Sequence, residues 1–174
     1  MANIVAIVGR PNVGKSTLFN RMVEKRQAIM DDISGVTRDR HYGYAEWCGQ
    51  FFTVIDTGGY VNGSHDKFES EIRKQVKLAI DEASAIIFVV DCRDGITGFD
   101  KDFANILRTS KKPIFVAANK ADTPDKAVMA GEFYELSLGE VYPISAENGG
   151  GTGAVGLHRS FQPLRDRGIH SDVS

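Results

Sequence analysis

Four residues near the start of the chain have the types and spacing of a phosphate-binding loop. Residues 9–16 read GRPNVGKS and fit the pattern Gly-x4-Gly-Lys-Ser/Thr, with Gly9, Gly14, Lys15 and Ser16 in the defining positions. The glycines let the backbone turn tightly, so that its N–H groups point inward toward an anion. Lys15 supplies a cation for the β- and γ-phosphates, and the Ser16 hydroxyl ligates Mg²⁺. These residues predict a nucleotide site, and the plainer alternative is a glycine turn before a helix.

A second group of candidate residues, Asp56-Thr57-Gly58-Gly59, comes at the end of the apolar run at residues 51–56. The pattern Asp-x-x-Gly is too short to be informative alone. After a strand and downstream of a phosphate loop, however, the Asp56 carboxylate suits Mg²⁺ held through water, and the Gly59 N–H suits a γ-phosphate oxygen. A β-turn after the strand is the alternative.

A third group, Asn119-Lys120-Ala121-Asp122, follows the buried run at residues 114–118 and so predicts a position at the carboxyl edge of a sheet. The Asp122 carboxylate only accepts hydrogen bonds, which suits the N1–H and 2-amino groups of guanine, whereas adenine offers no donor at N1 or C2. Two such bonds at about 1.5–3 kcal/mol each support a preference of several orders of magnitude over ATP. A solvated turn is the alternative.

The neighbours of Asp122 complete the predicted base site. We expect Asn119 to bond the other edge of the base and to hold the phosphate loop, and the Lys120 stem to lie over the ring. After a last predicted strand at residues 141–144, the tripeptide Ser145-Ala146-Glu147 is expected to offer an exposed N–H at Ala146 to the guanine carbonyl oxygen.

Predicted strands and helices alternate along the chain and position these groups. This alternation predicts an α/β fold, namely a three-layer P-loop NTPase fold with a mixed six-stranded sheet. A short connection at residues 48–50 predicts an antiparallel hairpin. A capping box at Asp66 and Glu69 predicts the start of a helix, and Thr97 the start of another that ends before Pro113. Residues 27–40 lack apolar periodicity and read as a long functional loop. The predicted strands are residues 4–8, 41–47, 51–56, 85–90, 114–118 and 141–144, and a first and a last helix are predicted at 16–26 and 132–138.

The composition is that of an ordinary globular protein. The chain has 174 residues, 42% of them hydrophobic and 25% charged, with a net charge of -2, which suits one domain and gives no direct nucleic-acid signal. Cys48 and Cys92 lie far apart beside predicted strands, so we expect buried free thiols and a cytoplasmic location. The sequence predicts no membrane span, and the scattered histidines predict no structural metal site.

The order of these motifs resembles that of Ras-like GTPases over residues 4–147. The strings GRPNVGKSTLFNR, GVTRDR, YGYAEW, IDTGGY and DCRDGIT are similar to the first GTPase domain of the bacterial Der (EngA) family of ribosome-assembly GTPases. The resemblance implies a GTPase domain at residues 1–153 and a tail at 154–174, without the second GTPase domain and the KH-like domain of the family. The chain departs from the family in two features. Ser34 stands where Pro is usual, and the tail lacks the usual amphipathic helix.

The resemblance also implies the roles of single residues. Mg²⁺ would be ligated by Ser16 and Thr37, with Asp56 in its outer shell, and Asn12, Lys15, Thr37 and Gly59 would act in hydrolysis. The predicted nucleotide contacts are Gly9, Arg10, Pro11, Asn12, Val13, Gly14, Lys15, Ser16, Thr17, Asp56, Thr57, Gly58, Gly59, Tyr60, Asn119, Lys120, Ala121, Asp122, Ser145 and Ala146.

Tyr60 stands where Ras-like enzymes place a water-orienting glutamine. A cation between the leaving and the transferring oxygens supplies charge of the kind that an arginine finger supplies elsewhere. The resemblance implies a K⁺ ion held by the Asn12 side-chain oxygen, by phosphate oxygens and by carbonyls of residues 33–36. The alternative is that Asn12 only stabilises the turn of the loop.

The sequence thus predicts a Mg²⁺-dependent switch domain that binds and hydrolyses GTP, with large-subunit ribosome assembly implied by the resemblance alone. One rival is a slow, nucleotide-gated binding module that regulates contacts of domains missing here. Another is an ATPase or small-molecule kinase with the same phosphate loop, which the guanine-selecting Asp122 disfavours.

Overall fold

The computed structural model of the chain describes residues 4–23, 41–47, 50–56 and 65–151. The predicted switch loop at 27–40, the segment 57–60 and the tail at 154–174 lie outside the described residues. None of the described helices combines the length and apolarity needed to cross a bilayer.

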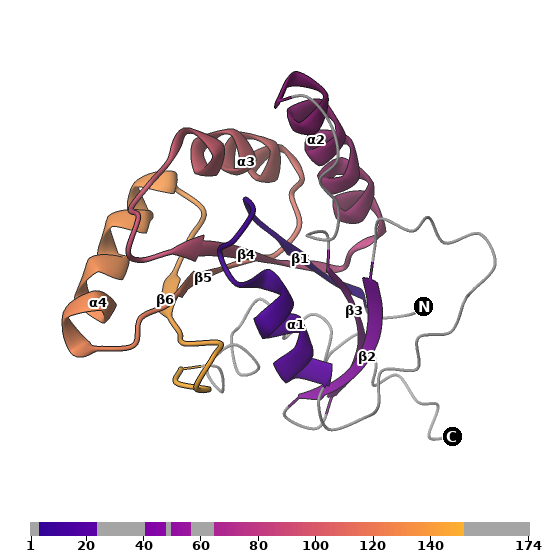
Figure 1. Cartoon of the computed structure of the whole chain (residues 1–174). Coiled ribbons are helices and arrows are strands. Elements are labelled where there is room, and N and C mark those ends of the chain that lie inside the picture. Colours follow the sequence, from indigo (N-terminus) through magenta and orange to yellow (C-terminus); the bar gives the residue numbers. More distant parts are fainter. Residues whose placement is uncertain (1–3, 24–40, 48–49, 57–64, 152–174) are drawn as a thin grey trace.

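Within the described residues a mixed six-stranded sheet forms the centre of the fold, as predicted (Figure 1). The strand order is β2-β3-β1-β4-β5-β6, in which β2 pairs antiparallel with β3 and all the other neighbours pair parallel. The strands are β1 (Ile4–Val8), β2 (His41–Trp47), β3 (Gln50–Asp56), β4 (Ala85–Asp91), β5 (Ile114–Asn119) and β6 (Val141–Pro143). Because the parallel strands run the same way, their carboxyl ends lie along one edge of the sheet.

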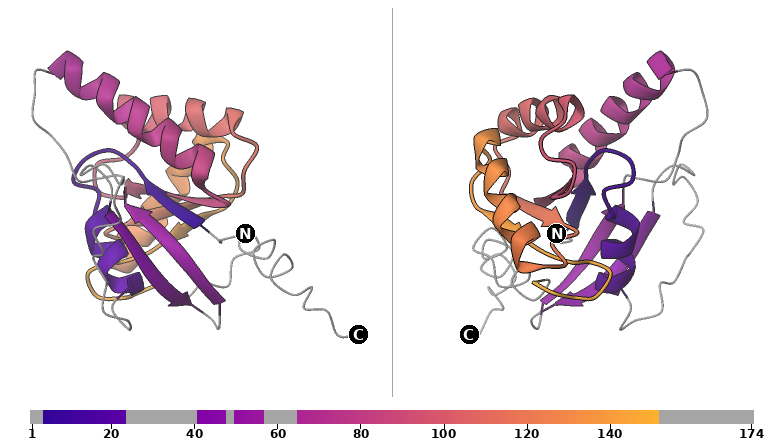
Figure 2. Two further views of the ribbon diagram at one scale, coloured as in Figure 1. Left: turned by 90° about the vertical axis from the view of Figure 1, so that its right-hand side faces the viewer. Right: turned by 60° about the vertical axis from the view of Figure 1, so that its left-hand side comes forward.

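The described helices cover both faces of the sheet, which confirms the three layers (Figures 1 and 2). Helix α1 packs on one face, while α2, α3 and a 3₁₀ helix pack on the other. The helices are α1 (Lys15–Val23), α2 (His65–Glu82), α3 (Gly98–Thr109) and α4 (Pro124–Met129), and the 3₁₀ helix η1 spans Ala130–Leu136.

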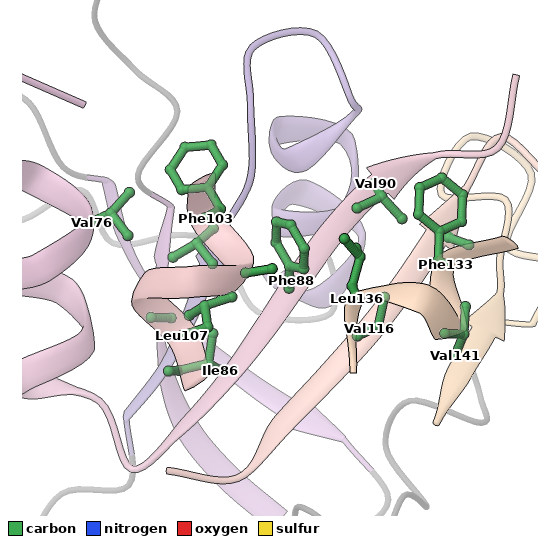
Figure 3. Packing of buried hydrophobic residues seen from close by; sticks show 14 of the residues in the cluster. Val76, Ile86, Phe88, Val90, Phe103, Leu107, Val116, Phe133, Leu136 and Val141 are labelled. Atoms are coloured by element: carbon green, nitrogen blue, oxygen red, sulfur yellow. The ribbon is translucent and has the colours of Figure 1, made fainter. Parts of the chain in front are cut away.

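The alternation of side chains along the strands divides the core into two clusters. In β4, Ala85, Ile87 and Val89 face α1, whereas Ile86, Phe88 and Val90 face α2 and α3. Figure 3 shows the second cluster, in which the Phe88 and Phe103 rings meet edge to face at a centroid distance of 6.2 Å. The buried hydrophobic residues that α1, α2 and α3 contribute to these clusters are Leu18, Phe19, Met22, Val76, Ala79, Ile80, Phe103, Ala104 and Leu107.

The capping signals have mixed outcomes. Thr97 caps α3 as predicted, because its side chain accepts from the Asp100 N–H while the Asp100 carboxylate accepts from the Thr97 N–H. The capping box at Asp66 is wrong, since α2 begins at His65 and Asp66 therefore lies inside the helix. Cys92 is a buried free thiol, as expected, and Cys48 lies outside the described residues.

The helix predicted at 132–138 corresponds to the 3₁₀ helix η1, and the short helix α4 that precedes η1 was not predicted. Thr123 accepts from the Lys126 N–H and caps α4, with Pro124 in the first turn, and the chain then tightens into η1. The buried residues of η1, Ala130, Phe133 and Leu136, recur every third position, which is the period of a 3₁₀ helix.

Candidate nucleotide-binding site

The phosphate loop predicted at residues 9–16 connects β1 to α1 at the carboxyl edge of the sheet. A Cβ atom at Gly9 would lie 2.5 Å from the Val89 carbonyl oxygen of β4, so only glycine lets the backbone run this close to the strand. Gly14 has φ +98°, and a Cβ there would collide with Nδ2 of Asn119. Helix α1 follows at once, since the Leu18 N–H donates to the Gly14 carbonyl oxygen at 3.1 Å.

Lys15 folds over this loop. Its side chain is 94% buried, with 6% exposed, and the ammonium donates to the carbonyl oxygens of Gly9 at 2.8 Å and Arg10 at 2.7 Å. Ser16 and Thr17 are exposed in the first turn of α1. The positive charge of Lys15 and the amino end of α1 are thereby concentrated at the same loop, which is the electrostatic requirement of a phosphate site.

Asn119, at the end of β5, joins the phosphate loop to the loop after β6. Its Nδ2 donates to the Val13 carbonyl oxygen at 2.8 Å, and its Oδ1 accepts from the Ala146 N–H at 2.9 Å. The side chain is only 3% exposed. The prediction that Asn119 holds the phosphate loop is therefore confirmed.

The prediction of an exposed N–H at Ala146 is wrong. The backbone after β6 returns across the end of β5, because Ile144 donates to the Ala118 carbonyl and accepts from the Ala121 N–H, each at 2.9 Å. This path brings Ala146 against Asn119, whose amide oxygen takes the buried N–H. Ala146 therefore positions Asn119 through this bond.

Lys120 connects a buried carboxylate to the phosphate loop. Its ammonium donates to the Asn12 carbonyl oxygen and pairs with Asp91, in both cases at 2.8 Å, and its backbone has φ +64°. Asp91, the last residue of β4, is 1% exposed and also accepts from the Arg93 N–H. Burial raises the pKa of Asp91, but the hydrogen bonds from Lys120 and Arg93 outweigh it and hold the pKa below its usual value.

Asp91 has a role that the sequence analysis missed. Its Cα is the sheet partner of the Asn119 Cα, so the two polar residues end neighbouring strands at the same level. The signal was present in the sequence, because an acidic residue directly follows the apolar run at 85–90.

Asp122 and Ser145 are joined by a hydrogen bond that the motifs alone did not predict. The Ser145 hydroxyl donates to Oδ1 of Asp122 at 2.6 Å, and Ser145 is 2% exposed whereas Asp122 is exposed. The buried serine thus orients a carboxylate that faces solvent.

Arg10 ties the phosphate loop to the start of α3. Its guanidinium lies 2.7 Å from the Asp94 carboxylate and 3.7 Å from Oδ1 of Asp100. Asp100 is fully buried, and burial raises its pKa. Among the described side chains, Arg10 Nε and Asp100 Oδ1 are buried polar atoms without a hydrogen bond.

The remaining predicted residues divide into two groups. Asp56 ends β3, and its Cα pairs with that of Ile7 in β1, which places this backbone beside the strand that leads into the phosphate loop. Thr37, Thr57, Gly58, Gly59 and Tyr60 lie outside the described residues.

Comparison with known proteins identifies the family. Residues 4–120 match the model of a family described as 50S ribosome-binding GTPase. The chain is 62% identical to GTPase Der of Cytophaga hutchinsonii over 168 residues, and 65% identical to GTPase Der of Amoebophilus asiaticus over 153 residues. These matches cover 97% and 88% of the chain but only 38% and 35% of the relatives, so the chain spans little more than a third of their length.

Among solved structures, the fold is similar to that of Era in complex with MgGDPNP and nucleotides 1506–1542 of 16S ribosomal RNA. The TM-score is 0.67 at 29% identity, over 88% of this chain and 54% of that one. The chain belongs to the family of 50S ribosome-binding GTPases.

Proposed function

We propose that this domain binds GTP together with Mg²⁺ and hydrolyses it to GDP and phosphate. The Asn119 side chain carries the proposal, because it bonds Val13 of the phosphate loop on one side and Ala146 on the other. Ala146 belongs to the loop at residues 144–151 that follows β6, here called the base loop. A nucleotide, which carries phosphates at one end and a base at the other, is the class of ligand that suits two loops joined in this way.

The base is guanine because Asp122 is an exposed acceptor. The Ser145 hydroxyl occupies one side of the carboxylate, which leaves its remaining lone pairs for the N1–H and 2-amino groups of guanine. Adenine would place an acceptor, N1, against this carboxylate and lose both hydrogen bonds.

Two residues at the phosphate end have side chains of the type that binds Mg²⁺. Ser16 lies in the first turn of α1, and the register of β3 brings Asp56 beside β1, whose end leads into the loop. Hydroxyl and carboxylate oxygens suit Mg²⁺, so we assign Ser16 as a direct ligand and Asp56 as a residue that holds the ion through water, with Thr37 as a second direct ligand by family resemblance. When bound, the ion neutralises charge on the β- and γ-phosphates. The Lys15 ammonium, which lies on the Gly9 and Arg10 carbonyl oxygens, would turn to these phosphates, and the N–H groups of the loop would stabilise the charge that develops on the leaving phosphate.

Phosphate release under single-turnover conditions tests this function. With Mg²⁺ present, we expect the chain to release phosphate from GTP, and an excess of ATP not to compete. Lys15→Ala is expected to remove the release, whereas Lys101→Ala, which changes an exposed lysine of α3, serves as the matched control and leaves it unchanged. Equal competition by ATP would contradict the guanine assignment. Tight GTP binding without release would favour the rival, a nucleotide-gated binding module.

The cellular role follows from similarity. Because the relatives are GTPase Der and the family is named for 50S ribosome binding, we propose that the full protein acts in assembly of the large ribosomal subunit in the cytoplasm. Era, the structural neighbour, is bound to 16S ribosomal RNA, which supports a ribosomal partner for this chain.

We also propose that K⁺ assists hydrolysis. Asn12 is exposed at the turn of the phosphate loop with φ +66°, and its backbone carbonyl accepts from Lys120. Its side-chain oxygen is therefore the group that we assign to the ion. A carboxamide oxygen is a hard, neutral ligand that suits an alkali cation beside phosphate oxygens.

Hydrolysis rates in KCl and NaCl at equal ionic strength test this proposal. We expect at least a tenfold faster rate in K⁺, as a charge near the transferring phosphate acts like an arginine finger. Asn12→Ala should abolish the difference while GDP affinity stays within a few-fold, and Asn105→Ala, an exposed asparagine of α3, provides the control. Equal rates in the two salts for the unmodified domain would overturn the role of K⁺.

A further inference from the structure

Arg21, in the last turn of α1, lies outside the predicted groups at 9–16, 56–59, 119–122 and 145–147 and contacts the base loop directly. Its Nε donates to the Ala146 carbonyl oxygen at 2.6 Å, and its Nη2 donates to the Glu147 carbonyl oxygen at 2.7 Å. Two neighbouring donors of one planar guanidinium thus hold two successive carbonyls, which fixes both the position and the orientation of this peptide segment.

The base loop is shaped to receive this guanidinium. The Ser145 N–H donates to the Gly150 carbonyl, and the Gly149 N–H donates to the Ser145 carbonyl, both at 2.7 Å, so the chain turns back on itself. Gly149 has φ +89°, and a Cβ there would lie 2.9 Å from Arg21 Nη1. A residue with a side chain would be strained at this φ, and its Cβ would press on the guanidinium.

The same segment is held from its other side by Asn119. The Ala146 N–H donates to Asn119 Oδ1, while the carbonyl oxygen of Ala146 accepts from Arg21. Ser145, the preceding residue, orients the Asp122 carboxylate through its hydroxyl. Arg21 is therefore connected to Asp122 through the backbone of residues 145 and 146 and the Ser145 hydroxyl.

We propose that Arg21 is a positioning residue for guanine selectivity. It fixes the Ala146 and Glu147 carbonyls, and thereby holds Ser145 at the place where its hydroxyl aims Asp122 at the base. This inference rests on the proposed guanine site. The selectivity of that site depends on two hydrogen bonds to one carboxylate, and both weaken when the carboxylate is free to rotate.

Affinities for GDP and IDP show whether Arg21 positions Asp122 or only stabilises the fold. IDP lacks the 2-amino group, so the ratio of the two dissociation constants reports how well Asp122 is aimed. For Arg21→Ala we expect GDP to bind at least tenfold more weakly, mainly through faster dissociation, and the preference for GDP over IDP to fall at least fivefold. Arg21→Lys, which keeps the charge but not the planar pair of donors, should lose most of the same preference.

Arg108→Ala is the matched control. Arg108 also holds a backbone carbonyl with two donors, Nε at 3.0 Å and Nη2 at 2.8 Å from the Leu136 oxygen, at the end of η1 and away from the base loop. We expect this variant to lower the melting temperature while keeping the GDP to IDP ratio. The lysine variant keeps the test decisive should Arg21→Ala fold poorly.

The outcomes distinguish this inference from the proposed function. If the unmodified domain does not prefer GDP over IDP, the guanine site itself is wrong. If the unmodified domain does prefer GDP and both Arg21 variants keep that preference within twofold, Arg21 does not position Asp122, and the inference is overturned. An equal loss of affinity for both nucleotides in both variants would also overturn it.

Discussion

Replacing Asp122 with asparagine is expected to turn a guanine-preferring domain into one that prefers xanthine. The carboxamide oxygen can accept from N1–H, and its amine can donate to the 2-oxo group of xanthine, whereas the 2-amino group of guanine then meets another donor. Ser145 supports this exchange, since its hydroxyl bonds one oxygen of residue 122 and so restricts the rotation of the side chain.

The expected change in base preference follows from the two hydrogen bonds between Asp122 and guanine. Each charge-assisted hydrogen bond contributes about 1.5–3 kcal/mol, so the preference of GTP over XTP should fall by roughly 10²- to 10³-fold or more. Dissociation constants for both nucleotides measure it. Asp125→Asn, at an exposed position of α4 three residues further on, is the control and should leave base preference unchanged. An Asp122→Asn variant that still prefers GTP would show that this carboxylate does not read the base.

A methyl group at Gly14 is expected to damage both halves of the site at once. Gly14→Ala forces a φ of +98° on a residue with a side chain and drives a Cβ into the buried amide of Asn119. Displacing that amide leaves the Val13 carbonyl and the Ala146 N–H without their partner, at about 1–3 kcal/mol each. We expect GDP affinity to fall by on the order of 100-fold and the melting temperature to drop.

A Gly139→Ala variant separates the effect of backbone strain from that of the collision with Asn119. Gly139 has a similar φ of +101°, but a Cβ at this position would meet nothing within 4 Å. Calorimetry of both variants, with and without GDP, should show a modest loss of stability for Gly139→Ala and unchanged affinity. If Gly14→Ala binds GDP as well as Gly139→Ala does, the contact with Asn119 has no role in binding.

Strand periodicity and motif spacing were sufficient to predict the sheet and the loops at its carboxyl edge. The apolar runs at 4–8 and 114–118 each correspond to a described strand, and both lead directly into a predicted motif. The short helix α4 was missed because none of its residues is buried, so it has no apolar stripe for periodicity to detect. Its signal was instead the pair Thr123-Pro124, a cap followed by a proline in the first turn.

The details of the site depend on contacts between residues far apart in sequence. Asp91 pairs with Lys120, 29 residues away in sequence, and Arg21 bonds Ala146, 125 residues away. No local sequence pattern predicts contacts at such separations. The Ala146 N–H illustrates the same point, because a motif predicts which residue type is present but not which neighbouring group takes its hydrogen bond. Spacing therefore predicted the motif residues, and only the structure showed the network that connects them.

The Asn119 bridge between Val13 and Ala146 has a further consequence for how a nucleotide would bind. Because one buried side chain sets the spacing between the two loops, the second end of a bound nucleotide meets its loop at a high effective concentration, as in a chelate. Much of the affinity then comes from the covalent link between the base and the phosphates. Guanosine or triphosphate alone would bind far more weakly than the intact nucleotide, and their binding free energies would add up to less than that of the nucleotide. The domain would thereby select the intact nucleotide over guanosine or triphosphate, although each fragment would make the same contacts as it does within the nucleotide.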